Sequence, residues 1–425
     1  MDDQKNRSRD IFRDPLSFFL TLARDRGDVV RYRSAPELAY LVNHPDYIKH
    51  VLVDNNRNYV KDTYINQMFK SYVADGLLTS EGEVWRRQRR LMQPAFHHQR
   101  LENLDASITG KTREMLARWE DACERGEPIL IAQEMSALTM SITTDILFGV
   151  DLGEEVRSIG QAVDMGGALL ERPKNARFRD ALNVIMEIVD RIIVERRAAA
   201  IDRGDLLSML LEARDETTGE GMDDELLRYQ VITLLLAGYE TTASALTWTW
   251  YLLAQHPKAA EKLQDETRRA LDGRIPTSQD VDRLGYANMV FEESMRLYPP
   301  AWILGRRALG EDQLGETRIL PGTVIAISPY TMHRHPRFWD QPDVFDPLRF
   351  TPERSAARHR FAYIPFGAGP RQCIGNTLSL LEAKLILSMA SQRFGVELIE
   401  DHPIKPEVVF VLRPDRQMRM RLKRL

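Results

Sequence analysis

One cysteine lies in a setting that suits a metal ligand. Cys373 belongs to the run Phe366-Gly-Ala-Gly-Pro-Arg-Gln-Cys-Ile-Gly375, whose glycines permit close backbone approaches that a Cβ forbids. Leucines spaced three and four residues apart follow and predict a helix that ends near Gly395. Cys373 therefore lies just before a helix N-terminus, where unpaired N–H groups and the helix dipole stabilise a thiolate. A thiolate held against iron donates electron density and favours O–O cleavage, whereas a lone cysteine is usually a buried, inert thiol.

A second chemical segment, Ala237-Gly-Tyr-Glu-Thr-Thr242, lies in the apolar middle of a long helix predicted over Asp223–His256. Glu240 is costly inside such a helix unless it is paired or solvated. The Thr241 hydroxyl can reach the carbonyl of Ala237 four residues earlier, a bond that bends helices. One interpretation is a slightly irregular core turn. The other is a groove lined by a hydroxyl, a freed carbonyl and an acid, which suits proton delivery.

Two further pairs lie at helical spacing. Glu293 and Arg296 are three residues apart, which by itself is typical of a surface ion pair. A Pro-Leu-Arg-Phe segment containing Arg349 follows them. Trp85 and Arg89 are four residues apart, so they share one helix face and could point to the same anionic group.

These segments together resemble the cytochrome P450 family. The family's haem-binding loop follows Phe-x-x-Gly-x-Arg-x-Cys-x-Gly, and every fixed position is present from Phe366 to Gly375. The family's oxygen-activating turn and its ExxR helix also occur, in the family's order, and the resemblance covers nearly the whole chain. The segment from Arg296 to Arg307 looks like soluble bacterial members, among which are carotenoid and fatty-acid hydroxylases. The family's pairing of ExxR with Pro-x-Arg-Phe implies a buried structural triad of Glu293, Arg296 and Arg349.

The resemblance implies a haem b cofactor with Cys373 as its axial iron ligand. Arg371 would bind a haem propionate by a charge-assisted hydrogen bond, and Phe366 would pack beside the sulfur and help set its potential. Arg306 is one candidate propionate ligand. Arg307 lies beside it, so the sequence does not decide which of the two arginines takes this role. Further cofactor contacts are implied for Gly367, Gly375, Ala237, Trp85, Arg89 and Arg306.

The same resemblance implies oxygen insertion from O2 into an unactivated C–H bond. Thr241 would steady the iron-bound dioxygen, and Glu240 would belong to the proton relay that splits it. A peroxide-driven peroxygenase is one alternative, although members of that branch tend to lack this acid–alcohol pair. A non-catalytic haem-binding sensor is another, since it would keep Cys373 without needing the pair.

The substrate is expected to be hydrophobic, such as a terpenoid or carotenoid, a fatty acid or a steroid. Its pocket should draw on mostly apolar stretches. These are Tyr64–Leu78, Asp164–Phe178, Leu234–Thr241, Ala301–Leu304 and Val409–Val411. The chain carries no fused flavin or iron–sulfur module, so a separate ferredoxin or flavodoxin with its NAD(P)H reductase is expected to supply electrons.

Composition limits the other classes of function. The chain has 425 residues, 43% of them hydrophobic, and a net charge of -4, which argues against nucleic acid as a partner. Two distant cysteines form no disulfide framework and favour a cytoplasmic location. No signal peptide and no apolar stretch of spanning length is visible, so no membrane anchor is expected. His333-x-His335 could form a metal pair, but no third ligand is evident.

The elements that must position these residues are mostly helices, with a small β region. Helical periodicity predicts a mostly α protein. The resemblance implies that it is organised as a single haem domain over residues 1–425. The predicted helices are Gln88–Phe96, Leu101–Glu124, Gln133–Leu147, Asp180–Ala200, Asp223–His256 and Asp280–Tyr298. The predicted strands are Val29–Arg33, Ala39–Val42, Thr323–Ser328 and Val408–Leu412.

Overall fold

The computed structural model describes residues 11, 13–34, 37–97, 104–149, 176–199, 201–400 and 402–425. It divides into two compact units, each built from segments far apart in the sequence. Unit 1 comprises Met1–Phe69 and Glu292–Cys373, and unit 2 comprises Lys70–Phe291 and Ile374–Leu425. The single haem domain expected over residues 1–425 stays a prediction.

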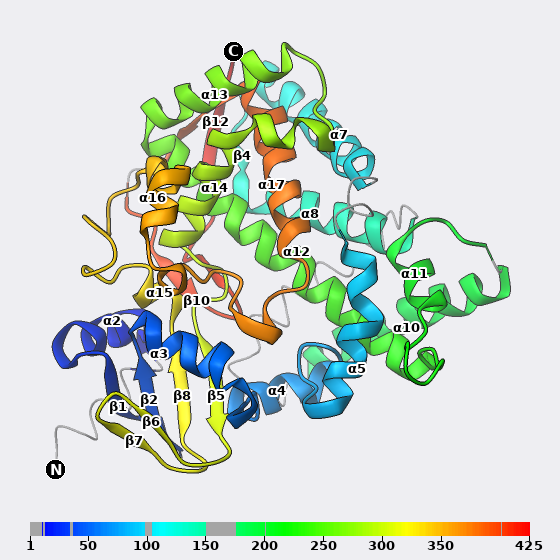
Figure 1. Ribbon diagram of the computed structural model, residues 1–425. Coiled ribbons are helices and arrows are strands. Elements are labelled where there is room, and N and C mark those ends of the chain that lie inside the picture. The colour runs from blue at the N-terminus through cyan, green and yellow to red at the C-terminus, as the bar shows by residue number, and fades with distance from the viewer. Residues whose placement is uncertain are drawn as a thin grey trace. The chain divides into compact units, whose positions relative to one another are not determined.

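A five-stranded sheet with the order β1-β2-β8-β5-β3 forms the frame of unit 1 (Figure 1). β8 runs parallel to β2, whereas the pairs β1–β2, β5–β8 and β3–β5 are antiparallel. The helix α2 (Pro15–Arg26) packs on this sheet. The strands are β1 (Val29–Ser34), β2 (Glu37–Val42), β3 (Tyr59–Val60), β5 (Leu304–Ala308) and β8 (Val324–Ile327).

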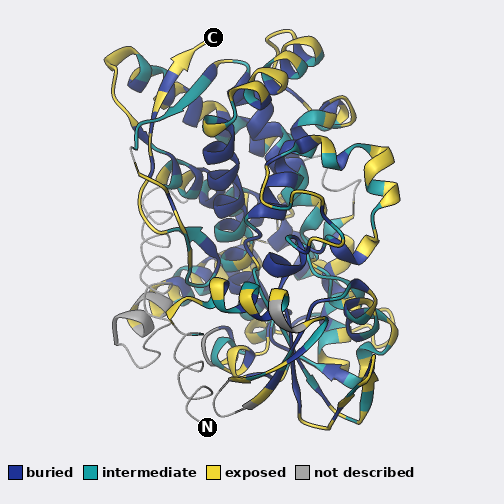
Figure 2. Ribbon diagram, turned by 90° about the vertical axis from the view of Figure 1, so that its left-hand side faces the viewer, coloured by how far each residue is buried: buried dark blue, intermediate teal, exposed yellow. Residues whose placement is uncertain are grey.

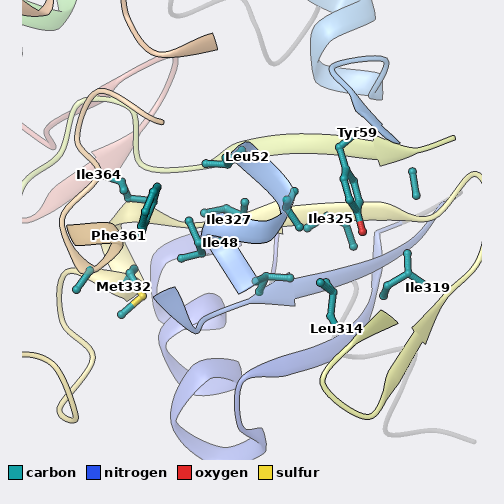
Figure 3. Packing of buried hydrophobic residues seen from close by; sticks show 14 residues of the cluster. Ile48, Leu52, Tyr59, Leu314, Ile319, Ile325, Ile327, Met332, Phe361 and Ile364 are labelled. Carbon is teal, nitrogen blue, oxygen red and sulfur yellow. The ribbon is translucent and has the colours of Figure 1, made fainter. Parts of the chain in front are cut away.

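A cluster of buried hydrophobic residues joins this sheet to the irregular segment that precedes Cys373. Strand residues such as Ile325 and Ile327 meet Ile48 and Leu52 from the turns after β2 (Figure 3). Phe361 and Ile364, only a few residues before the cysteine loop, belong to the same cluster. The loop is therefore attached to a rigid core, because protein interiors are closely packed.

The helix α12 (Asp224–Gln255) forms the centre of unit 2 and packs on α8 (Ile131–Phe148), α10 (Ala176–Ala199) and α17 (Asn376–Ser391) (Figure 1). Asp223 caps its N-terminus by accepting a hydrogen bond from the Leu226 N–H. Its C-terminal half is buried nearly all round, and Figure 2 shows the packed helices largely in the buried colour. No helix among the described residues is long and apolar enough to cross a membrane.

The remaining elements are short or peripheral. The helices are α3 (Pro45–Lys49), η1 (His50–Asp54), η2 (Asn56–Asn58), α4 (Tyr64–Val73), α5 (Gly82–Met92), η3 (Gln93–Phe96), α7 (Asp105–Arg125), α11 (Leu206–Glu212), α13 (Pro257–Leu271), η5 (Ser278–Arg283), α14 (Gly285–Leu297), α15 (Pro329–Met332), η6 (Pro347–Phe350), α16 (Pro352–Ala357), η7 (Arg360–Ala362) and η8 (Gly369–Arg371). The strands are β4 (Ile129–Leu130), β6 (Asp312–Leu314), β7 (Thr317–Ile319), β9 (Phe394–Leu398), β10 (Pro406–Val408), β11 (Leu412–Pro414) and β12 (Arg419–Arg424).

Three predicted elements differ from the structure. The helix predicted over Asp280–Tyr298 begins only at Gly285, because Thr277 and Asp280 form a capping box on a separate 3-10 turn over Ser278–Arg283. The helix predicted over Gln88–Phe96 begins earlier, at Gly82, and tightens into a 3-10 turn from Gln93, because Pro94 has no N–H to donate. The strand predicted over Val408–Leu412 is wrong. Its middle is the turn of a hairpin in which β10 pairs with β11, because the apolar run bends back on itself.

Candidate active site

The loop that carries Cys373 is a series of tight backbone turns in unit 1. The Gly367 N–H donates to the Ile364 carbonyl at 3.0 Å, and the Cys373 N–H donates to the Phe366 carbonyl at 3.0 Å. Gly367 and Gly369 both have φ of +70°, a conformation that residues with a Cβ rarely adopt. These turns hold the cysteine backbone in place while its thiol remains exposed.

Gly369 meets a second steric demand. A Cβ built on it would lie 2.0 Å from the carbonyl oxygen of Leu52. Leu52 belongs to η1, a π-helical turn, and such turns are frequent at functional sites. The loop is thus pressed against η1. Gly375 differs, because a Cβ there would meet nothing within 4 Å.

The donor set around Cys373 fits a haem iron better than a metal held by protein ligands alone. A thiolate is a soft ligand that suits iron. The described residues contain no group of three or more His, Cys, Asp and Glu side chains that could hold a metal ion. A lone thiolate suits an iron whose in-plane ligands belong to a porphyrin.

The middle of α12 in unit 2 has the expected local geometry. The Thr241 hydroxyl donates to the Ala237 carbonyl at 2.8 Å. Ala237 is exposed and Glu240 and Thr241 are half-buried, on a helix that is otherwise largely buried. Gly238 allows α8 to approach, since its Cβ would lie 3.3 Å from a methyl carbon of Thr143. The segment therefore presents a carbonyl, a hydroxyl and a carboxyl at an accessible stretch of helix.

The structure brings Glu293, Arg296 and Arg349 together in unit 1. The Arg296 guanidinium donates to both Glu293 carboxylate oxygens, at 2.6 and 2.8 Å, and both side chains are 0% exposed. The Arg349 guanidinium lies 3.4 Å from the same carboxylate. This degree of burial excludes the surface ion pair considered from the sequence.

The two arginines also bind the irregular segment that follows α15. Arg296 donates to the carbonyl oxygens of His333, Pro342 and Val344 at 2.9, 2.6 and 3.1 Å. Arg349 donates to the carbonyl oxygens of Asp340 and Gln341 at 2.5 and 3.0 Å. Nearly all these contacts use backbone acceptors, so the guanidinium groups replace the regular secondary structure that this segment lacks.

The remaining candidate propionate ligands belong to different elements. Trp85 and Arg89 lie half-buried on α5 in unit 2, and Arg89 also donates to the Gln93 side chain at 3.1 Å. Arg306 is 7% exposed on β5 in unit 1. Its neighbour Arg307 binds the Asp62 and Gly322 carbonyls, so it is already engaged at the sheet edge. Arg306 in turn donates to the Gly305 carbonyl at 2.8 Å, so these hydrogen bonds do not choose between the two arginines.

Glu382 is a buried acid that the sequence analysis missed. It lies on α17, nine residues after Cys373, and is 4% exposed. Its Oε1 atom has no hydrogen-bond partner, and burial raises the pKa of this carboxyl to about 8. Nothing in its spacing distinguishes it from a surface acid, so only packing identifies it.

We expect Glu382→Gln to stabilise the protein increasingly as the pH rises above about 4.5. The folded pKa of about 8 exceeds the ordinary value of 4.5, so the folded state binds the proton more tightly. The wild type should therefore lose stability as pH rises from 4.5 through 8, relative to the variant. The difference should reach on the order of 5 kcal/mol above pH 8, since each pKa unit is worth about 1.4 kcal/mol. Thermal unfolding at several pH values measures it, and a pH-independent difference would contradict the assignment.

Comparison with known proteins agrees with this architecture. The cytochrome P450 family profile matches residues 8–420. Cyclooctatin synthase from Streptomyces melanosporofaciens is 39% identical over 93% of this chain and 88% of its own. Cyclooctat-9-en-7-ol 5-monooxygenase from the same organism is 36% identical over 90% of this chain and 85% of its own. The crystal structure of the cytochrome P450DA haem domain superposes with a TM-score of 0.89 at 27% identity, covering 96% of this chain and 93% of that one.

These similarities extend over nearly the whole chain and include the expected mostly helical fold with small sheets. The family uses haem, dioxygen, a hydrophobic substrate and a partner that donates electrons. The chain belongs to the cytochrome P450 family and is a haem-dependent monooxygenase.

Proposed function

We propose that the chain hydroxylates a C–H bond of a terpenoid, with Cys373 as the thiolate ligand of haem b. The observation that carries this proposal is the turn of α12, where the Thr241 hydroxyl is bonded to the Ala237 carbonyl beside Glu240. When bound, the haem supplies dioxygen activation and the oxidising power for the C–H bond. The chain supplies the ligand, the proton path and the pocket.

The residues around Cys373 hold the cofactor. The fixed backbone turns keep the thiolate in one orientation, and Phe366 and the backbone N–H groups after it tune the sulfur. Gly367 and Gly375 would leave room for the porphyrin. Arg371, Trp85, Arg89 and Arg306 would bind the propionates through charge-assisted and neutral hydrogen bonds. Glu293, Arg296 and Arg349 act structurally, by holding the segment before the loop.

The residues of α12 transfer protons to the reaction site. Ala237 would leave space for dioxygen. The Thr241 hydroxyl donates its proton to the Ala237 carbonyl, so its oxygen would accept a hydrogen bond from a water that delivers protons. Glu240 is half-buried, so it can exchange protons with solvent and pass them inward. Both groups lie on one helix turn, which keeps them in register without a separate loop.

An apolar terpenoid is the substrate class that we favour. The relative named cyclooctat-9-en-7-ol 5-monooxygenase acts, by its name, on a cyclic alkenol. On α12 the half-buried Leu234 and Leu236 precede Ala237 and offer an apolar surface. Of the stretches expected to line the pocket, residues 164–175 lie outside those that the structure describes. Carotenoids, steroids and fatty acids are the other compounds to test.

We infer a ferredoxin or flavodoxin as the electron donor, in the cytoplasm. Basic residues on α5 are the candidate docking groups, but several are already paired within unit 2. Arg86 pairs with Glu83, Arg87 with Gly221 and Glu220, and Arg90 with Asp215. These residues therefore contribute less to docking than their number suggests, because each pair is internally neutralised.

We expect Thr241→Ala to divert electrons from product to peroxide. Without the hydroxyl, the product formed per NAD(P)H consumed should fall on the order of tenfold, since positioned proton donors contribute at least that factor. The assay compares product and peroxide for a terpenoid chosen by its low- to high-spin shift of the ferric Soret band.

Thr242→Ala is the matched control. Its hydroxyl lies 3.4 Å from the Ser379 hydroxyl on α17, away from the Ala237 bond, so coupling should persist. A Thr241→Ala enzyme that stays fully coupled would refute the proposed role of this turn. Equal turnover with peroxide alone would favour a peroxygenase. A protein that binds haem but turns over no compound of the panel would favour a sensor.

A further inference from the structure

His333 bridges α14 and the segment that leads into the cysteine loop. It follows α15 directly and is 0% exposed. Its Nδ1 atom lies 3.2 Å from the Arg296 carbonyl oxygen. The Ile364 N–H donates to its Nε2 atom at 2.9 Å. Both ring nitrogens are thus occupied by backbone groups, which excludes the metal pair with His335 considered from the sequence.

These two partners fix the tautomer of the ring. A backbone N–H can only donate, so Nε2 must be the unprotonated acceptor. A carbonyl oxygen can only accept, so the single proton must be on Nδ1. Burial, followed by the nearby Arg296, holds the pKa of His333 well below its usual range, which agrees with a neutral ring.

The contact with Arg296 is reciprocal. The Arg296 guanidinium donates to the His333 carbonyl at 2.9 Å, while the His333 ring donates to the Arg296 carbonyl. Arg296 is itself held by Glu293. The ring also packs against Tyr363, with centroids 5.1 Å apart, and the Tyr363 hydroxyl donates to the Glu292 carbonyl. The buried ion pair therefore determines where His333 lies.

From Ile364 the constraint passes along the backbone. The Ile364 carbonyl accepts from the Gly367 N–H, and the next turn ends with the Cys373 N–H on the Phe366 carbonyl. The Ile364 side chain is packed in the buried cluster with Phe361 and Met332 (Figure 3). His333 holds the N–H of the residue from which the loop starts.

We propose that His333 is a positioning residue for Cys373, which transmits the position of Arg296 through Ile364 to the thiolate loop. The proposal rests on the role of Cys373 as the haem ligand. Each side of the ring contributes separately: the Nδ1 side attaches His333 to α14, and the Nε2 side attaches the loop to His333.

Two variants separate the sides of the ring. His333→Gln places an amide oxygen near the Nε2 position, where it can accept from the Ile364 N–H. His333→Asn places its amide near the Nδ1 position and leaves that N–H buried without an acceptor. The readout is the fraction of haem-loaded protein whose ferrous–CO complex has the red-shifted Soret band of thiolate ligation.

We expect His333→Asn to raise the fraction without thiolate ligation about tenfold, the effect typical of an unsatisfied buried donor. His333→Gln should stay close to the wild type. His335→Asn is the matched control, because its ring accepts only from the nearby Arg337 N–H at 3.2 Å. Equal loss in both His333 variants, or no loss in either, would overturn the proposal.

A second measurement is needed if the His333→Asn variant fails to fold. The reduction potential of His333→Gln should then match the wild type, whereas a shifted potential would contradict the proposal. A wild-type protein without the thiolate band would instead refute the assignment of Cys373, and so the proposed function.

Discussion

The Cys373→Ser variant is expected to keep its fold and lose both thiolate ligation and oxygenation. The loop is held by backbone groups, since the Cys373 N–H donates to Phe366 and the turn before it depends on glycines. Serine differs from cysteine only in carrying oxygen in place of sulfur, so the replacement removes little packing. Product formation should fall at least on the order of a thousandfold, because the hydroxyl is a far poorer electron donor than a thiolate.

Three measurements check this expectation: the ferrous–CO spectrum, product formation with a coupled donor, and thermal unfolding. Cys123→Ser is the matched control, because Cys123 is the other cysteine and its thiol donates to the Leu422 carbonyl at 3.6 Å. It should retain the spectrum and the activity. A Cys373→Ser protein that kept the thiolate band would mean that another residue binds the iron.

The Arg296→Met variant should be the most destabilised of the single changes considered. It removes the bidentate partner of Glu293, which is 0% exposed, and leaves that carboxylate with the Arg349 guanidinium at 3.4 Å. Breaking such a buried pair costs about 3–5 kcal/mol. It also deprives the carbonyls of His333, Pro342 and Val344 of their donors. Chemical denaturation should show this loss, together with poor haem retention.

Two comparisons make the Arg296 prediction specific. Arg318→Met removes an exposed ion pair with Glu311 and should change the free energy of unfolding by less than about 1 kcal/mol. The double variant Glu293→Gln, Arg296→Met should recover part of the lost stability, because it no longer contains the buried Glu293 carboxylate charge. A single Arg296→Met change as mild as Arg318→Met would show that the pair contributes little to stability.

The local chemistry of this protein could be predicted from its sequence, because it depends on residues close together in the chain. The glycines around Cys373 do adopt the left-handed conformation at positions 367 and 369, and Thr241 does bond to Ala237. The long helices were likewise predictable, since their apolar faces repeat with the helical period.

What the sequence could not predict depends on contacts between distant segments. The Leu52 carbonyl lies so close to Gly369 that no Cβ would fit there, although more than three hundred residues separate the two in the sequence. No sequence pattern identifies Leu52 as a neighbour of Gly369. From the sequence, His333 could be considered a metal ligand, because its spacing from His335 does not reveal that backbone groups bind its ring. The strand predicted over Val408–Leu412 was wrong because an apolar run carries no signal for the hairpin within it.

The buried arginines have a consequence for how this part of the protein can diverge. Arg296 and Arg349 bind the segment after His333 through its carbonyl oxygens, which every amino acid possesses. The shape of the segment is therefore specified by two side chains outside most of it, and not by its own residue types. Distant relatives should be free to exchange the residues at 340–344 while keeping the same path. The two arginines and Glu293 should therefore be more strongly conserved among relatives than the residues of the segment that they bind.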